Sequence, residues 1–385
     1  MHIEYTNGYY DGSVNYNNKP DGYGKLVIFD NYTYEGYFQN DKFHGKGKVV
    51  RPDGTYYDGE WLDDKKHGYG KETFQNSSYY EGEYANNVKH GKGRYYWADG
   101  ARYEGDYSYD HRTGKGILHW PNGNYYEGDF ANDEMHGKGR SVFSSGAYYE
   151  GEYSHGHYSG HGKEKFKNGN YYEGDFVDNE MHGKGRYVFS SGGYYEGDFS
   201  NGKFSGHGKL VDFDGTYYDG EWRDDKKHGY GKEKFKNGSY YEGNFVNDEI
   251  HGKGRFVWLS GAYYEGEFSH NKFSGHGKQV DPDGAYYDGE WQDGNMQGFG
   301  KLFVTAESFY KKSENANRYI GDKSLMLQYE GEWINGKING YGKLYQFNGY
   351  YEGYFSEGYR HGHGTFYFND SQKKTGEWKN GTFVG

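Results

Sequence analysis

The sequence predicts an all-β fold: an elongated, gently twisted, single-layer antiparallel sheet built from consecutive β-hairpins. A Tyr–acid–Gly motif starts at Tyr34, returns at Tyr57, and keeps this 23-residue period without a slip to Tyr287. Within each period aromatic and polar residues alternate, as in a half-buried strand. Asp-Gly, Asn-Gly or Ser-Gly pairs, which favour tight turns, separate one such stretch from the next.

The composition excludes an ordinary globular core. Only 33% of the residues are hydrophobic, yet 21% are aromatic, with 49 Tyr and 67 Gly among 385 residues. Disordered chains are poor in aromatic residues, so this chain is not expected to be disordered. Rings placed at a fixed period can bury their area against the neighbouring repeat. We therefore expect an ordered array without a central core.

Charge and cysteine content exclude further classes. The net charge of -12 disfavours a nucleic-acid partner, which would require a basic surface. The absence of Cys excludes disulfides and thiolate metal sites. The N-terminus has no apolar run of the kind found in signal peptides, and no stretch of about 18 apolar residues could span a membrane. We expect a cytoplasmic protein.

Each repeat can be numbered from its motif tyrosine as position 0. Position 2 is Gly and position 4 is aromatic, while positions 1 and 3 are mostly acidic, which predicts a first strand. Glycines at 11 and 13, Lys or Arg at 12 or 14, and a frequent aromatic residue at 17 predict a second strand. If the turn between them is centred between positions 7 and 8, opposed positions sum to 15. Gly 2 then faces Gly 13, and the ring at 4 faces Gly 11. Large rings can lie over the space left by the missing side chains, which predicts a packing role for the glycines.

The same register predicts cross-strand charge pairs, because the acids at 1 and 3 face the basic residues at 14 and 12. One interpretation is a solvated face whose charges neutralise one another. The alternative is a row of basic residues that binds lipid or another ligand.

Position -1 is also Tyr in most repeats and points to the face opposite position 0. These rings either stack only on one another or form a groove that binds a partner peptide. The candidate partner-binding residues of this row are Tyr125, Tyr148, Tyr171, Tyr194, Tyr217, Tyr240, Tyr263 and Tyr286.

The period divides the chain into four parts. Residues 1–33 form an N-terminal capping repeat, 34–300 form twelve regular repeats, 301–328 form an insertion, and 329–385 form C-terminal repeats and a cap.

The insertion is the one surface that does not repeat. Its sequence is compatible with either an overlong hairpin or a short helix. Periodicity cannot decide between the two over so short a stretch. Insertions in repeat arrays often map to the binding face, so Phe309 and Tyr310 are further candidate partner contacts. The alternative is a length variation without function.

The sequence predicts no catalytic residue, metal site or cofactor. Histidines recur at position 10 or 12, where neighbouring copies would lie about 10 Å apart, too far to share one metal ion. The paired carboxylates recur equally, whereas an active site needs one distinctive constellation. The Gly-x-Gly stretches lie in strands without a following helix, so they are not phosphate loops.

The pattern Tyr126-Glu127-Gly128-Asp129-Phe130, a short spacer, and then His136-Gly137-Lys138-Gly139 resembles the MORN-repeat family. The resemblance covers about residues 9 to 385 as about sixteen repeats, with no additional catalytic domain. It implies a twisted hairpin sheet used for scaffolding, partner binding, dimerisation or attachment near membranes. Similar arrays occur in protist cytoskeletal proteins, in radial-spoke heads of cilia and in junctophilins at membrane contacts.

Enzymes of this family carry a separate catalytic domain, such as a lipid kinase or a methyltransferase. In this chain the repeats occupy all but the insertion, which is too short for such a domain. We therefore expect a non-catalytic scaffold that binds helical or extended segments of protein partners in a cytoskeletal or ciliary assembly. A homodimer through the terminal repeats is a further expectation. The alternative is a peripheral membrane adaptor that binds acidic phospholipids, weakly, through the lysine pairs at 65–66 and 226–227.

Overall fold

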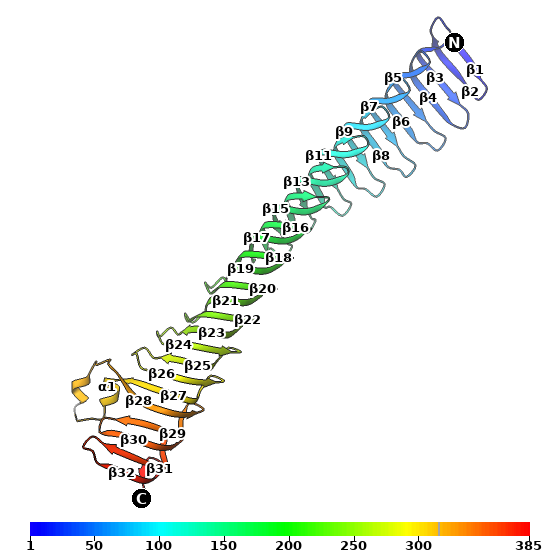
Figure 1. Cartoon of the computed structure of the whole chain (residues 1–385). Helices are drawn as coiled ribbons and strands as arrows, with labels where there is room; N and C mark the ends of the chain where they lie inside the picture. The colour runs from blue at the N-terminus through cyan, green and yellow to red at the C-terminus, as the bar shows by residue number, and fades with distance from the viewer. Residues whose placement is uncertain (315) are drawn as a thin grey trace. The chain divides into compact units, whose positions relative to one another are not determined.

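The computed structural model describes residues 1–314 and 316–385. It contains 33 strands, and within each of its two parts consecutive strands pair antiparallel in an open sheet, so the predicted all-β class is confirmed (Figure 1). The chain divides into two compact parts, an N-terminal half (Met1–Ser190) and a C-terminal half (Ser191–Gly385).

The N-terminal half consists only of strands and turns. Its strands are β1 (His2–Tyr5), β2 (Gly8–Val14), β3 (Pro20–Ile28), β4 (Tyr32–Gln39), β5 (Lys42–Val50), β6 (Tyr56–Leu62), β7 (Lys65–Thr73), β8 (Tyr79–Ala85), β9 (Val88–Tyr96), β10 (Arg102–Ser108), β11 (His111–His119), β12 (Tyr125–Ala131), β13 (Glu134–Val142), β14 (Tyr148–Ser154), β15 (His157–Lys165), β16 (Tyr171–Val177) and β17 (Glu180–Val188).

The C-terminal half adds two short helices to the same pattern. Its elements are β18 (Tyr194–Ser200), β19 (Lys203–Val211), β20 (Tyr217–Arg223), β21 (Lys226–Lys234), β22 (Tyr240–Val246), β23 (Glu249–Val257), β24 (Tyr263–Ser269), β25 (Lys272–Val280), β26 (Tyr286–Gln292), β27 (Asn295–Thr305), α1 (Ala306–Tyr310), η1 (Ala316–Tyr319), β28 (Leu325–Ile334), β29 (Lys337–Gln346), β30 (Gly349–Ser356), β31 (Tyr359–Phe368), β32 (Lys373–Lys379) and β33 (Thr382–Phe383).

The repeat that starts at Tyr126 represents the others. Its strands β12 and β13 are joined by Asn132 and Asp133, whose φ angles of 49° and 71° match the left-handed turn that suits a two-residue hairpin loop. After β13 the chain turns again, and the Phe143 N–H donates to the carbonyl of Ala147 at 2.9 Å. The aromatic residue at position 17, predicted to lie in the second strand, therefore begins this second turn.

The predicted register is right near the motif and wrong near the turn. Gly128 faces Gly139 as expected, but Phe130 faces Met135 and not Gly137. The first turn lies at positions 6 and 7, one residue earlier than predicted, and a β-bulge at positions 11 and 12 restores the register. Gly137 has a φ of +56° in this bulge, a conformation that favours glycine.

An acidic side chain closes the bulge. The carboxylate of Asp129, at position 3, accepts a hydrogen bond of 3.0 Å from the N–H of Lys138, at position 12. The same contact joins Lys115 to Asp106 and His207 to Asp198, each at 3.0 Å. The acid at position 3 thus accepts a hydrogen bond from a backbone N–H that the bulge would otherwise leave without a partner.

The ring of Tyr126 packs on the glycine pair. A Cβ atom built on Gly139 would lie 2.5 Å from Cζ of this ring, so glycine is required there for space. The packing role predicted for the glycines is present, but the ring at position 0 fills it, whereas the ring at position 4 was predicted to do so. Tyr126 is fully buried, and its hydroxyl donates to the carbonyl of Asp129 at 2.8 Å. Burial raises the pKa of this hydroxyl, which keeps it protonated as a donor.

Rings at positions 0 and 4 form the core of each half. Phe130 makes edge-to-face contacts with Tyr126 of its own repeat and Tyr103 of the preceding repeat, with centroids 5.2 and 5.0 Å apart. Tyr153 of the next repeat meets Tyr126 at 5.0 Å. Each ring therefore holds two repeats together, and burial is local to neighbouring repeats.

Substitution of Tyr126 by Phe is expected to lower the free energy of unfolding by about 1 kcal/mol, because the Asp129 carbonyl at the bulge loses its partner while the ring stays in place. Urea unfolding of the purified chain measures this. Tyr148→Phe is the matched control, since the half-buried Tyr148 lies on the opposite face, and its expected effect is below about 0.5 kcal/mol. Equal effects of the two substitutions would contradict the assigned role of the hydroxyl.

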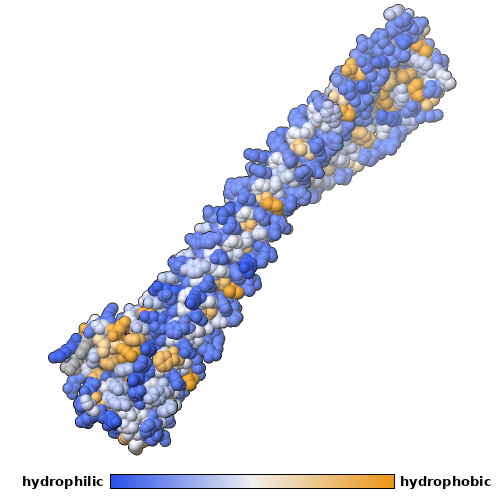
Figure 2. Space-filling view, in the orientation of Figure 1, coloured by the Kyte–Doolittle hydropathy of each residue, from blue (hydrophilic) through white to orange (hydrophobic). Residues whose placement is uncertain are grey.

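The insertion combines the two predicted alternatives. Thr305 at the end of β27 pairs with Leu325 at the start of β28, so the hairpin is overlong, and α1 and η1 lie in its loop (Figure 1). Phe309 and Tyr310 are half-buried, with ring centroids 5.1 Å apart. An apolar patch covers this region of the C-terminal half, whereas the surface of the strands is mostly hydrophilic (Figure 2).

Both terminal segments extend the sheet. β1 precedes the repeat predicted to be first and pairs with β2. At the other end β33 pairs with β32, and Lys374, which stands where the motif tyrosine would be, places its Nζ 4.2 Å from the ring centre of Phe383.

Candidate functional site

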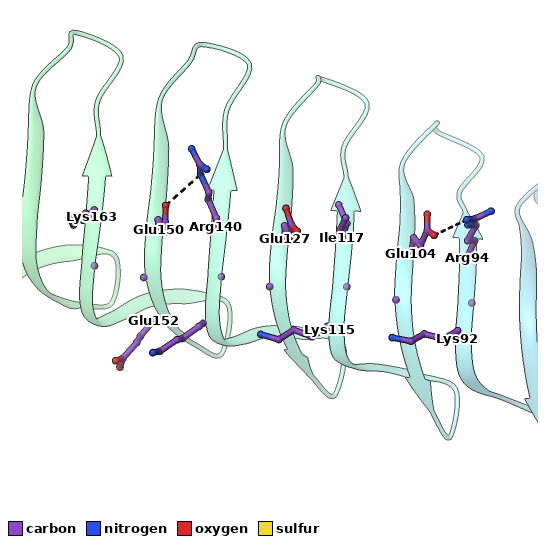
Figure 3. Close-up of a pocket in the computed structure, with 18 of the residues that line it drawn as sticks. Lys92, Arg94, Glu104, Lys115, Ile117, Glu127, Arg140, Glu150, Glu152 and Lys163 are labelled. Carbon is purple, nitrogen blue, oxygen red and sulfur yellow. Dashed lines mark hydrogen bonds and ion pairs between the residues drawn. The ribbon is translucent and has the colours of Figure 1, made fainter.

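The face opposite the buried tyrosines carries a groove in each half. The groove of the N-terminal half has a volume of about 1240 Å³, and that of the C-terminal half about 750 Å³. Glycines at positions 2 and 13 line both grooves, because a side chain at these positions would point to the ring face, so that only backbone lies here between the flanking charged side chains. Charged residues at positions 1, 3, 12 and 14 project beside these glycines (Figure 3).

Ion pairs cross from one repeat to the next. The basic residue at position 14 pairs with the acid at position 1 of the following repeat, as in Arg94–Glu104 at 2.8 Å and Arg140–Glu150 at 3.8 Å (Figure 3). Positions 1 and 14 of one hairpin also face each other, as predicted, but the ion pairs form between repeats.

The pairs at positions 12 and 3 also join neighbouring repeats, and there the predicted register within one hairpin is wrong because of the bulge. Lys115 Nζ lies 2.6 Å from a carboxylate oxygen of Asp129, and Lys92 lies 2.6 Å from Asp106. Burial opposes ionisation of Asp129, but hydrogen bonds from Lys115 and from the N–H of Lys138 hold the pKa of its carboxyl below the ordinary value.

The charges of the two grooves are nearly balanced. Six Lys or Arg and five Glu line the first groove, and three Lys or Arg and four acids line the second. A row of basic residues that would attract an anionic ligand is therefore not present in either groove.

The tyrosines at position -1 lie on the same face as the grooves and are half-buried. A cation from position 14 of the preceding repeat covers many of these rings, including Arg255 over Tyr263 at 3.9 Å and Lys278 over Tyr286 at 3.7 Å. Such rings contact cations more than one another, and only Tyr240 of the predicted row lines a groove. Their role in partner binding stays a prediction, as does that of Phe309 and Tyr310.

Exposed rings at positions 3 and 12 were not predicted. Tyr69 lines the first groove, and its hydroxyl donates to Glu81 at 2.9 Å. The end repeats carry ring pairs, Tyr23 with Tyr37 and Tyr341 with Tyr354, each with centroids 5.4 Å apart. In the sequence these rings could have been recognised as aromatic residues at positions where most repeats have a charged residue or His.

Only one lysine of each pair considered for membrane binding is free to contact a membrane surface. Lys66 forms an ion pair with Glu72 on the ring face, and Lys227 pairs with Glu233 in the same way. Only Lys65 and Lys226 of these pairs are exposed.

In the described ranges, 1–314 and 316–385, no three His or acidic side chains gather closely enough to hold a metal ion. None of the helices in the described part of the chain combines the length and apolar character that crossing a bilayer requires.

Consecutive hairpins that bury their rings only against neighbours define a repeat protein whose array is consistent with a non-catalytic scaffold. The family model of the MORN repeat matches fifteen consecutive segments, and the chain belongs to the MORN-repeat family, which is generally non-catalytic. The matched segments are 10–31, 34–56, 57–79, 80–102, 103–125, 126–148, 149–171, 172–194, 195–217, 218–240, 241–263, 264–286, 287–303, 329–349 and 351–373.

Solved structures resemble the chain only distantly. The wild-type TCP10 domain of Danio rerio CPAP is 14% identical with a TM-score of 0.30, covering 51% of this chain and 93% of that chain. The same domain in complex with a peptide of Danio rerio STIL is 13% identical with a TM-score of 0.29, covering 64% and 95%. The SAS-4 (dCPAP) TCP domain of Drosophila melanogaster, in complex with a proline rich motif of Ana2 (dSTIL), is 14% identical with a TM-score of 0.21, covering 46% and 85%. No curated protein matches this chain.

Proposed function

We propose that this protein is a non-catalytic scaffold that binds an extended segment of a protein partner along the groove of its N-terminal half. The observation that carries the proposal is the repetition of one lining pattern over five consecutive repeats, from Tyr69 to Lys163. Neighbouring repeats lie two strand spacings apart, so the groove runs about 40 Å, the length of about 12 extended residues.

The chemistry of the groove favours a peptide over a small molecule. Small-molecule sites are mostly enclosed and apolar, with a few polar groups. This groove is bordered instead by alternating charges of both signs and has glycines between them. An extended segment can place its backbone over the glycines and its side chains against the charges, and such complementarity provides specificity.

Replacement of both Lys115 and Lys138 by Glu is expected to weaken partner binding about tenfold, because it reverses two charges in the middle of the groove. Affinity purification of the full chain with crosslinking mass spectrometry should place partner crosslinks on Lys92, Lys115 and Lys138. Lys42 and Lys167 are exposed outside the groove and serve as controls. Crosslinks confined to the control lysines would exclude the groove as the binding site.

We also propose that the row of half-buried tyrosines contributes to the same binding. Simultaneous replacement of Tyr217, Tyr240 and Tyr263 by Ser removes three rings of this row in the C-terminal half, of which Tyr240 lines the groove. Loss of partners in a pull-down supports the proposal, whereas an unchanged set of partners limits the row to a structural role.

The exposed ring pairs at the end repeats support self-association there. Tyr341 and Tyr354 are 47% and 53% exposed, and rings so exposed are typical interface anchors. Light scattering after gel filtration should show a dimer that the double replacement by Ser makes monomeric. A wild-type monomer at the highest soluble concentration would exclude this homodimer.

We place the scaffold in the cytoplasm, within a cytoskeletal or ciliary assembly, as its family resemblance implies. Fluorescence microscopy of the tagged chain tests this placement, and a diffuse distribution would contradict it. Flotation with phosphatidylserine vesicles tests the membrane alternative. Little retention is expected, because Lys66 and Lys227 are held in ion pairs.

A further inference from the structure

The charge pattern of the N-terminal groove is broken at one place. Position 14 is Lys or Arg in eleven of the twelve regular repeats, and it is Ile117 in the repeat that starts at Tyr103. The acid that would pair with this position, Glu127 in the following repeat, is retained. An acid therefore stands in the groove without the cation that its position has elsewhere.

Ile117 and Glu127 face each other on β11 and β12, and both line the groove. Arg140 faces Glu127 within one hairpin, but it turns to Glu150 at 3.8 Å and covers the ring of Tyr148 at 4.9 Å. Among the described residues, no hydrogen bond or ion pair involves the side chain of Glu127, which is exposed.

Figure 3 shows this difference between adjacent repeats. Arg94 with Glu104 and Arg140 with Glu150 are joined as ion pairs on the two sides of Ile117 and Glu127. The free carboxylate lies between two neutralised pairs, about one repeat spacing of 10 Å from each. A ligand that moves along the groove thus meets one uncompensated charge at a defined place.

We propose that Glu127 and Ile117 are the point at which the groove recognises a basic side chain, Arg or Lys, of the extended partner segment. This inference rests on the proposed function and names the residue class that sets the register of the partner. The partner's cation would take the place that the chain's own residue at position 14 takes in other repeats. Arg can present two parallel N–H groups to a carboxylate, and the aliphatic stem of either residue can pack on Ile117.

The neighbouring repeats disfavour the same residue. At Glu104 and Glu150 a basic side chain of the partner would have to displace Arg94 or Arg140 and would meet like charge. The second groove has the same protection, since Glu242 pairs with Lys232 at 3.4 Å and Glu265 with Arg255 at 3.8 Å. Specificity therefore comes from one attractive point and from repulsion on both sides of it.

The decisive variant restores the common pattern. Ile117→Arg adds an ion pair to Glu127 of the kind present in the other repeats, so the variant should fold as the natural chain does. It should nevertheless lose binding, because Glu127 is then neutralised within the protein. Glu127→Gln removes the charge directly and is the second variant. Asp58→Asn is the matched control, because Asp58 stands at the same position in an earlier repeat, pairs with Lys48 at 3.6 Å and lies outside both grooves.

The probe is a library of random twelve-residue peptides, selected on the full chain by display. Affinities of the selected peptides are then measured by fluorescence anisotropy. The selected peptides should share one Arg or Lys, and Ile117→Arg and Glu127→Gln should each weaken binding at least about tenfold, whereas Asp58→Asn should change it less than about twofold. Replacement of the shared basic residue by Gln should weaken binding to the natural chain and have no further effect on Glu127→Gln.

The outcomes separate the inference from the proposed function. Peptides that bind in the groove but are insensitive to Ile117→Arg and Glu127→Gln would overturn the inference and leave the proposed function in place. A library without any selected peptide would overturn both. Capture of phosphatidylserine vesicles in place of peptides would also overturn both, since a free carboxylate in the groove should repel an anionic surface.

Discussion

Replacement of Gly139 by Val is expected to lower the free energy of unfolding of the N-terminal half by about 3 kcal/mol. The backbone at Gly139 is extended, so the substitution introduces no conformational strain. The loss arises because the new Cβ would lie 2.5 Å from Cζ of the Tyr126 ring, whose other face is enclosed by the core. The ring must move, and its hydroxyl must then leave the Asp129 carbonyl.

The control for this substitution is Gly146→Ala in the second turn of the same repeat. Gly146 has a φ of +84°, and no atom would lie within 4 Å of an added Cβ. Only the left-handed conformation penalises a side chain there, by about 1 kcal/mol.

Urea unfolding gives the total loss, and hydrogen exchange of the β12 and β13 amides shows where it occurs. Because burial links only neighbouring repeats, protection should fall around β12 and persist in distant strands such as β3. Equal losses for Gly139→Val and Gly146→Ala would mean that the ring does not depend on the space at Gly139.

The hairpins and their partners near the motif could be predicted from periodicity alone. Alternation determined that positions 0, 2 and 4 share one face, and the pairing of Gly128 with Gly139 followed from the length of the repeat. These features depend on residues close in sequence, which is why single repeats contain the information.

The bulge could not be derived from alternation, because the two residues that it adds, at positions 11 and 12, leave the alternation of the strand unchanged. It moved Phe130 from Gly137 to Met135. A signal was nevertheless present in the sequence. Ring packing explains the glycine at position 13, but it leaves the glycine at position 11 unexplained, and a left-handed backbone is the common reason for such a residue.

The candidate site was predicted only in part. The face that carries the tyrosine row was identified correctly, but the cations that cover rings such as Tyr263 depend on side-chain directions that the sequence does not specify. The grooves lie over backbone between charged side chains, and their extent depends on the directions of those side chains. The exchange of a cation for Ile117, by contrast, is visible in the sequence as soon as the repeats are aligned.

A second large effect on stability is expected from a substitution at position 15 of the repeat that starts at Tyr149. Glu164 faces Tyr149 in its own hairpin and Tyr172 in the next repeat, so its carboxyl lies on the ring face. Burial raises the pKa of Glu164 to about 7. In the described part of the chain no hydrogen bond or ion pair reaches this carboxyl.

Two other repeats have Glu at the same position and supply a cation for it. Glu233 pairs with Lys227, and Glu72 pairs with Lys66 and accepts a hydrogen bond of 2.9 Å from Tyr84. In both repeats the lysine stands at position 9. The repeat of Glu164 has Tyr158 there, stacked on Tyr149 with centroids 3.7 Å apart, and so lacks the cation.

Replacement of Glu164 by Gln is therefore expected to stabilise the N-terminal half by about 2 kcal/mol above pH 8 and to have little effect near pH 4. The folded chain keeps Glu164 protonated up to about pH 7, whereas the unfolded chain releases this proton near the ordinary pKa of 4.5. The stability that the protonated carboxyl contributes is thus fully present below pH 4.5 and is lost as the pH rises through 7. The full linkage value of about 3 kcal/mol is reduced to about 2 because Glu164 is only half-buried.

The measurement is the difference in urea unfolding free energy between Glu164→Gln and the natural chain, from pH 4 to pH 9. Glu233→Gln is the matched control and should have the opposite sign at pH 8, a loss of about 1 kcal/mol or more, because it leaves Lys227 without its partner. The substitution Tyr158→Lys should supply the missing cation. In that background the effect of Glu164→Gln on the unfolding free energy should no longer depend on pH in this way. A difference for Glu164→Gln that does not vary with pH would show that the carboxyl ionises in the folded chain as it does in water.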